Sequence, residues 1–197
     1  NMGGHAQQER MIYDKKRSLD KALLYSYQGA DIKKVDAPDD EKPCRALINP
    51  NKLKQGYDDK VVSCNWDYGL APGSIFQWMG TDTYWIIYLQ DLTELAYFRG
   101  DIRKCSHTIK WMDVDTNEIH TTYAAVRGPV ETKISSSTKN GDNLDSPNYS
   151  LSILIPESES ALKYFRRYAK FYMQGYSDGA PIVCWKVNAV NWISMPG

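Results

Sequence analysis

The sequence has few of the residues that build metal and catalytic sites. It contains three histidines and four cysteines among 197 residues, and no two cysteines form a CxxC pair. Structural zinc sites usually draw their ligands from closely spaced cysteines and histidines. We therefore expect no metal site and no cofactor. We expect the thiols to be reduced and mostly buried, with one disulfide pair as the alternative. The cysteines are Cys44, Cys64, Cys105 and Cys184.

The sequence also lacks an excess of charge of either sign. Lys and Arg number 24, Asp and Glu number 24, and the formal net charge is zero. A protein that binds a phosphate backbone normally carries an excess of basic residues. The zero net charge gives no reason to expect nucleic-acid binding, although a local basic patch is still possible. No apolar run approaches the ~20 residues that a membrane span needs, and there is no secretory signal. We expect a soluble protein that does not associate with membranes.

The histidines do not suggest catalysis. His5 lies in a loose N-terminal stretch, whereas His107 and His120 fall on strands that we expect to pair, near Cys105. The two strand histidines could approach each other. A Cys–His nucleophile would also need an orienting carboxylate and an oxyanion site, and the sequence identifies neither. We interpret these residues as polar positions on a sheet face and expect that the protein is not an enzyme.

Strand-forming residues dominate the stretch Ser74–Val126. The apolar runs Ser74–Met79 and Thr83–Gln90 are joined by the short loop Gly80-Thr81-Asp82, which predicts a hairpin. The second run is apolar on both of its alternating faces, which indicates a central strand covered on both sides. The chain is rich in aromatic residues, with 6 Trp and 14 Tyr. These are typical of β-structure, or alternatively of a surface that meets partners.

The run Asp101–Asp113 predicts a half-buried strand. From Cys105 onward, apolar and polar residues alternate with a period of two. The earlier part is out of phase, so we place a bulge or a strand start near Arg103. Residues 113–118 (DVDTNE) lack the glycine and the bidentate glutamate of a calcium loop and are interpreted as a turn. Ile119–Val126 then returns as the antiparallel partner.

The N-terminal region predicts a helix followed by a linker. Glu9–Tyr27 contains no Gly or Pro, and its apolar stripe is narrow. Such a helix would dock on the β-core or on a neighbouring subunit, with Ile12, Leu19 and Leu23 as candidate docking residues. Ala30–Pro43 is charged and contains proline, so we interpret it as an extended linker. Residues 1–43 together are predicted to form an assembly arm.

The remainder predicts a mainly β domain over residues 44–197. We expect an antiparallel β-barrel or sandwich with the N-terminal helix, a short helix in the C-terminal half and a long mobile loop. The short helix is placed at Glu157–Arg167, with acidic residues in its first turn and basic residues later. Further short strands are expected at Ala46–Ile48, Lys60–Trp66, Val130–Ser135, Tyr149–Ile155, Lys170–Gln174 and Ile182–Ile193.

The stretch Ser136–Asn148 (SSTKNGDNLDSPN) is the most loop-like part of the chain. A loop of this length in a compact domain is usually functional or disordered. It is either a loose hairpin tip or an arm that becomes ordered on contact with a partner. The candidate channel or assembly residues in it are Thr138, Lys139, Asn140, Asp142, Asn143 and Asp145.

In CSHTIKWMD (Cys105–Asp113), a cysteine, a polar pair and Thr-Ile-Lys-Trp precede an acidic residue and a predicted hairpin. This motif resembles a pattern of tailed-bacteriophage structural proteins, which has Thr-Leu-Lys-Trp at the same place. Here Ile109 replaces the leucine. PGSIFQWMGTDTYWIIY (Pro72–Tyr88) looks like the upstream hairpin of that pattern, and the ILIP and CWKV segments follow in the same order downstream. The resemblance covers most of residues 44–195 and leaves out the N-terminal helix.

This resemblance implies a small β-barrel component of the head-to-tail neck, such as a head-closure, stopper or connector protein. Such proteins form rings under the portal, continue or close the DNA channel, and join the portal or adaptor to the tail. The implied location is the virion, after synthesis in the host cytoplasm, and packaged DNA is passed or held without sequence-specific binding. We expect a homo-oligomeric ring whose subunits meet through two different patches.

Two alternatives stay open at this point. One is another virion position, in a tail-tube, tail-terminator or tail-hub protein. The other is a barrel that binds single-stranded nucleic acid, with exposed Tyr and Trp as stacking platforms. That alternative requires a basic groove, for which the candidates are Arg99, Arg103, Lys104 and Lys110.

Overall fold

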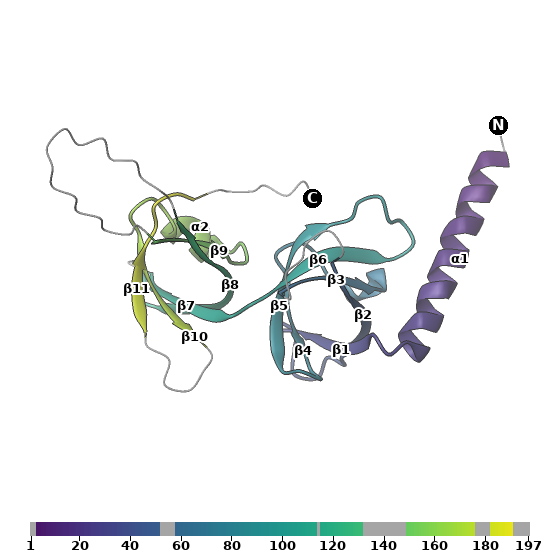
Figure 1. The fold of residues 1–197 in the computed structure, drawn as a ribbon, viewed down its shortest axis with the longest axis horizontal. Coiled ribbons are helices and arrows are strands. Elements are labelled where there is room, and N and C mark those ends of the chain that lie inside the picture. The colour runs from purple at the N-terminus through teal and green to yellow at the C-terminus, as the bar shows by residue number, and fades with distance from the viewer. Residues whose placement is uncertain (1–2, 52–57, 114, 132–148, 176–181, 191–197) are drawn as a thin grey trace, which may run out of the picture.

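The fold is mainly β, as the sequence predicts, and its strands form two antiparallel sheets. The computed structural model describes residues 3–51, 58–113, 115–131, 149–175 and 182–190. Figure 1 shows the two sheets side by side, with the long helix α1 (Gly3–Tyr25) on the far side of the first. No helix within these ranges is both long and apolar enough to cross a membrane.

The first sheet closes into a barrel of strand order β1-β2-β3-β6-β5-β4. Its core contains large side chains with no exposed surface, among them Phe76 and Phe98. The predicted hairpin is confirmed, because β4 and β5 pair antiparallel, and β5 is flanked on its other side by β6. The strands are β1 (Gly29–Lys34), β2 (Cys44–Pro50), β3 (Asp59–Cys64), β4 (Ile75–Trp78), β5 (Thr83–Gln90) and β6 (Phe98–Lys104).

The second sheet has the strand order β11-β10-β7-β8-β9 and curves like half a barrel. The short helix α2 (Glu159–Tyr164) packs with it, and Ser158 caps the helix by accepting a hydrogen bond from the Ala161 N–H. Three aromatic rings meet edge to face in this core, with Phe165 between Trp111 and Phe171. The strands are β7 (His107–Met112), β8 (Ile119–Glu131), β9 (Tyr149–Leu154), β10 (Lys170–Gly175) and β11 (Val183–Lys186).

The chain passes from one sheet to the other between β6 and β7. The Cys105 N–H donates to the Tyr84 carbonyl at 2.8 Å, and the next N–H, of Ser106, donates to the Ala124 carbonyl at 3.0 Å. Tyr84 of β5 stacks on Tyr123 of β8 with ring centroids 4.0 Å apart. The prediction of one strand over residues 101–113 is therefore wrong. Near Arg103, where we expected a bulge or a strand start, β6 ends at Lys104 and the chain crosses to the second sheet, in which β7 begins at His107.

Other boundaries also differ from the sequence predictions. The first half of the predicted linker is wrong, because Gly29–Lys34 forms β1 and pairs with both β2 and β4. The helix α1 begins at Gly3 rather than near Glu9. Val130, expected in a separate strand, belongs to β8, whereas Trp66 leaves β3 for a short 3-10 helix. The last expected strand is shorter, and residues 191–193 of it lie outside the described residues.

Candidate functional site

The C-terminal half of α1 docks on the barrel of its own chain. Leu19 and Leu23 are buried, and Ile12 is half-buried, so the predicted docking residues lie on the inner side of the helix. The helix contacts β1 and β2. Lys15 pairs with the buried carboxylate of Glu94 at 3.0 Å, and Arg45 Nε donates to the Leu23 carbonyl at 3.1 Å, where a cation suits the end of the helix dipole.

Most of the other described side chains of α1 are exposed. Met11 and Tyr13 in its first half, and Leu24 and Tyr25 at its end, are large apolar side chains in contact with water. Tyr13 and Leu24 are eleven residues apart, which is close to three helical turns, so they share one face. That face is roughly 110° around the helix from the one that carries Leu19 and Leu23. The helix therefore presents apolar residues that the described part of the chain does not cover.

The candidate loop residues cannot be assigned to a site. Thr138, Lys139, Asn140, Asp142, Asn143 and Asp145 lie outside the described residues. A channel or assembly role for these residues stays a prediction.

The histidines and cysteines are dispersed. His107 pairs with Ala124, whereas His120 lies opposite Trp111 and stacks on it at 5.4 Å, so the expected approach of the two histidines is wrong. Four strand residues separate these positions, or roughly 13 Å. Burial raises the pKa of the Cys105 thiol to about 12 and lowers the pKa of His107. Within the described ranges, no three His, Cys, Asp or Glu residues are grouped to hold a metal ion.

The cysteines are all free, and the expectation of mostly buried thiols holds for only some of them. Cys64 and Cys105 are buried, Cys44 is half-buried and Cys184 is exposed. A hydrogen bond from the Cys64 thiol lowers the pKa of Cys44, and the same bond, with burial, raises the pKa of Cys64. These two thiols are therefore neighbours on the barrel wall.

Two cations of the basic groove suggested by the sequence have acidic neighbours within the barrel. Arg103 Nε pairs with Asp59 at 2.8 Å, and the Arg103 guanidinium lies 4.7 Å from the centre of the Tyr88 ring. Arg99 pairs more loosely with Asp91, at 3.9 Å. Arg103 is thus closely paired within the barrel, whereas Arg99 stays exposed beside a long ion pair.

The structure instead reveals cations that sequence reasoning missed. We define the cationic cluster as Arg166, Arg167, Lys170 and Lys186. All four are exposed, and the ion pairs identified in the described part of the chain involve none of them. The run RRYAK was visible in the sequence, but its arginines were assigned to the end of a helix. The helix ends at Tyr164, so they lie in the turn before β10 instead.

Tyr168 organises the cationic cluster. Its ring centre is 4.9 Å from the Arg167 guanidinium and 4.4 Å from the Lys186 ammonium, both within cation–π range. Its φ is 75°, a strained value for a bulky residue. Two backbone bonds hold this conformation, because the Tyr168 N–H donates to the Val187 carbonyl at 2.7 Å and the Val187 N–H donates to the Ala169 carbonyl at 2.9 Å.

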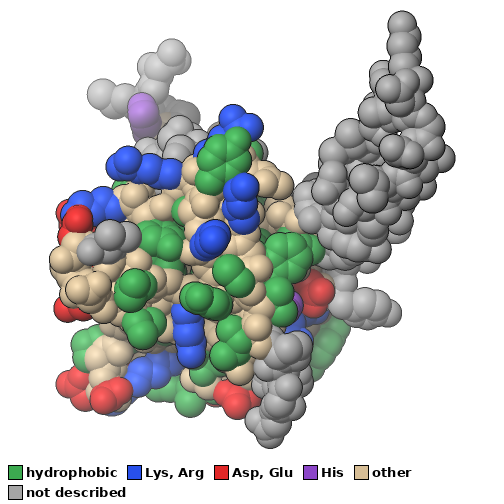
Figure 2. All heavy atoms as spheres, turned by 90° about the vertical axis from the view of Figure 1, so that its left-hand side faces the viewer, with side chains coloured by type: hydrophobic (Ala, Val, Ile, Leu, Met, Phe, Trp, Pro, Cys, Tyr) green, Lys and Arg blue, Asp and Glu red, His purple; other side chains and the backbone are tan. Residues whose placement is uncertain are grey.

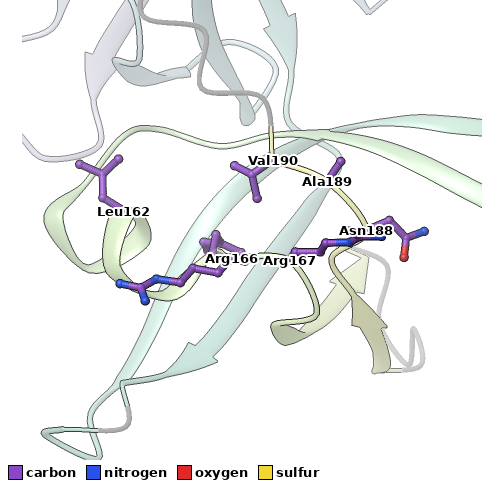
Figure 3. A pocket seen from close by; sticks show the side chains of 7 residues that line it. Leu162, Arg166, Arg167, Asn188, Ala189 and Val190 are labelled. Carbon is purple, nitrogen blue, oxygen red and sulfur yellow. The ribbon is translucent and has the colours of Figure 1, made fainter.

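An open hollow of about 810 Å³ adjoins the cationic cluster (Figure 3). Apolar side chains of Leu162, Phe165 and Val190 line it together with Arg166 and Arg167. In Figure 3, Arg166 extends to one side of the hollow and Arg167 lies on the other. Figure 2 looks onto the side of the molecule that carries the second sheet, and it shows Lys and Arg side chains among hydrophobic ones in the middle, with Asp and Glu toward the margins. The arrangement suits an anionic partner that also carries small apolar groups.

No protein family, no curated protein and no solved structure matches this chain.

Proposed function

We propose that this protein is a structural component of a tailed-bacteriophage neck. In this proposal its subunits form a ring that joins the portal or adaptor to the tail and continues or closes the DNA channel. The protein is made in the host cytoplasm, resides in the virion, acts without a catalytic step, and lets packaged DNA pass or holds it without sequence-specific binding. The motif resemblance over residues 44–195 supports the proposal.

The observation that carries the proposal is the exposed length of α1. The helix has 23 residues and is roughly 34 Å long. Leu19 and Leu23 are its buried hydrophobic residues, and both lie in its second half. Most helical stability in proteins comes from packing of an apolar face, so the first half of α1 gains little from its own barrel. Packing on a neighbouring subunit would stabilise that half and cover Tyr13 and Leu24.

The strand topology is compatible with assembly of this kind. The barrel is closed, whereas the second sheet ends in the edge strands β9 and β11 among the described residues. Edge strands and exposed helices are the elements through which chains commonly add to one another. A ring that surrounds DNA needs such lateral contacts but no catalytic constellation.

The proposal is favoured over a single-strand-binding barrel by the ion pairs of Arg99 and Arg103. Groove cations that are paired within the chain offer little to a phosphate backbone. Other positions in the virion, in a tail tube, tail terminator or tail hub, use rings as well and are separated from the neck by location.

Antibody labelling of intact virions tests this proposal. A gold-labelled antibody against this protein is expected to bind at the junction of head and tail. Label along the tail or at its tip would favour one of the tail positions, and virions without the protein would contradict both. A titration with single-stranded DNA and RNA serves as the companion measurement, and tight, salt-sensitive binding would favour the nucleic-acid alternative.

A further inference from the structure

The cationic cluster carries charge that no ion pair balances within the described part of its own chain. Lys170 of β10 lies directly opposite Lys186 of β11. Like charges in directly opposite strand positions destabilise a sheet. The strained backbone of Tyr168 adds to that cost while it keeps Arg167 and Lys186 near one ring. An anion bound at the cationic cluster would relieve the repulsion, so the arrangement is that of an anion-binding surface.

The chain itself contains a matching anionic segment. Residues 36–41 (DAPDDE) follow β1, and we call them the acidic segment. Asp36, Asp39 and Asp40 are exposed, and the ion pairs found within the described ranges include only Glu41 of this segment, which lies 3.9 Å from Lys34. The acidic segment interleaves its carboxylates with Ala37 and Pro38. These small apolar groups match the apolar floor of the hollow beside the arginines.

The two surfaces lie on different sheets. The acidic segment follows β1 of the barrel, whereas the cationic cluster lies around β10 and β11 of the second sheet, and Figure 1 shows β1 and β11 well apart. We propose that the cationic cluster binds the acidic segment of a second copy of this chain. Such a contact joins two different patches, and repetition of it closes a ring when the rotation between subunits allows. The inference rests on the proposed ring and names a contact within it.

Nucleic acid is the less favoured occupant of the cationic cluster. A single strand would need an aromatic face on which bases stack, and the Tyr168 ring already has two cations beside it. A duplex held by its phosphates alone would need a wider basic surface, and the chain has no net positive charge. The acidic segment needs neither feature.

Sedimentation velocity on the full chain tests the inference, over a wide concentration range at low and at high salt. One variant carries Arg166→Glu with Arg167→Glu, a second carries Asp39→Lys with Asp40→Lys, and a third combines all four changes. Arg99→Glu, at an exposed cation on the barrel, is the matched control. Circular dichroism establishes that each variant is folded.

The wild type and the control are expected to self-associate in a salt-sensitive manner. Each double reversal is expected to weaken association by about tenfold or more, and the combined variant to recover it. Wild-type association that neither reversal weakens would overturn the inference and leave the proposed ring intact. A wild type that stays monomeric throughout would overturn it as well, and virion labelling would then decide the neck proposal separately. DNA binding that only the arginine reversal removes would identify nucleic acid as the occupant and overturn the inference.

Discussion

Replacement of Leu23 by alanine is expected to release α1 without unfolding the barrel. Leu23 is 5% exposed and is one of two buried leucines that hold the helix on β1 and β2. Buried Leu→Ala changes cost 2–5 kcal/mol, and the lower end applies where the site can relax toward solvent. We therefore expect about 2 kcal/mol, which is a roughly 30-fold increase in the opening equilibrium of the helix. The buried core of the barrel contains no residue of α1, so the strands should not be affected.

Amide hydrogen exchange measures this opening segment by segment. In the Leu23→Ala protein, the amides of α1 are expected to exchange about 30-fold faster, whereas those of β3 and β6 keep their protection. Leu24→Ala is the matched control, because the neighbouring leucine is 71% exposed and its removal should leave α1 as protected as in the wild type.

Three results would refute this reasoning. Unchanged exchange in α1 of the Leu23→Ala protein would mean that the helix does not depend on its inner face. Equal acceleration by Leu24→Ala would mean that the two faces are not distinct. Simultaneous loss of protection in α1 and the barrel would show that the helix belongs to the global folding unit.

Three further predictions concern thiols, a buried ion pair and the long loop. An alkylating reagent should label the exposed Cys184 in the folded protein and reach Cys105 only after unfolding, because burial holds the pKa of that thiol near 12; equal labelling by mass spectrometry would contradict this. Asp59→Asn should lower the free energy of unfolding in urea by about 2 kcal/mol or more, because this buried carboxylate holds two arginines. The exposed Asp31→Asn control should cost less than about 1 kcal/mol, and a similar loss in both would argue against a special role of burial. Deletion of Thr138–Ser146 should leave the thermal transition of the monomer intact but weaken assembly or genome retention, and normal assembly with full retention would exclude the loop from that role.

The parts of the fold that depend on local pattern could be predicted from the sequence. The hairpin of β4 and β5 is an example, because two apolar runs joined by a short glycine-containing loop pair with each other as neighbouring antiparallel strands. The pairing of β7 with β8 follows in the same way from alternation on either side of a polar turn. In that turn, Asp113 Oδ1 accepts the N–H of Asp115 at 2.8 Å.

Features set by distant pairing could not be predicted. The sequence pattern of residues 101–113 predicts one strand. In the structure β6 pairs with β3 and β5, whereas β7 pairs with β8 and β10. The change of phase near Arg103 was the local signal of this break, but it does not specify that the two segments pair in different sheets. The strand β1 was missed because only Ala30 and Ile32 of its six residues face the core, and the charged residues between them resemble a linker.

The cationic cluster was missed for a related reason. Its cations come from the turn after α2 and from two strands, and the pairing of β10 with β11 brings Lys170 and Lys186 together. Composition could not indicate it either, because the balanced charge of the chain hides a local excess. Along α1, the apolar stripe narrowed the inward residues without specifying them, because Leu19 and Leu23 are buried whereas Met11 and Leu24 are exposed.

The most direct test of the central claim is whether the protein forms rings. The purified chain is examined alone and then with the portal, adaptor and tail proteins of its virion, by mass measurement in solution and negative-stain imaging. Closed rings of this protein, alone or on a portal or adaptor partner, are the result that the neck proposal predicts. A chain that stays monomeric and binds none of these partners would contradict it.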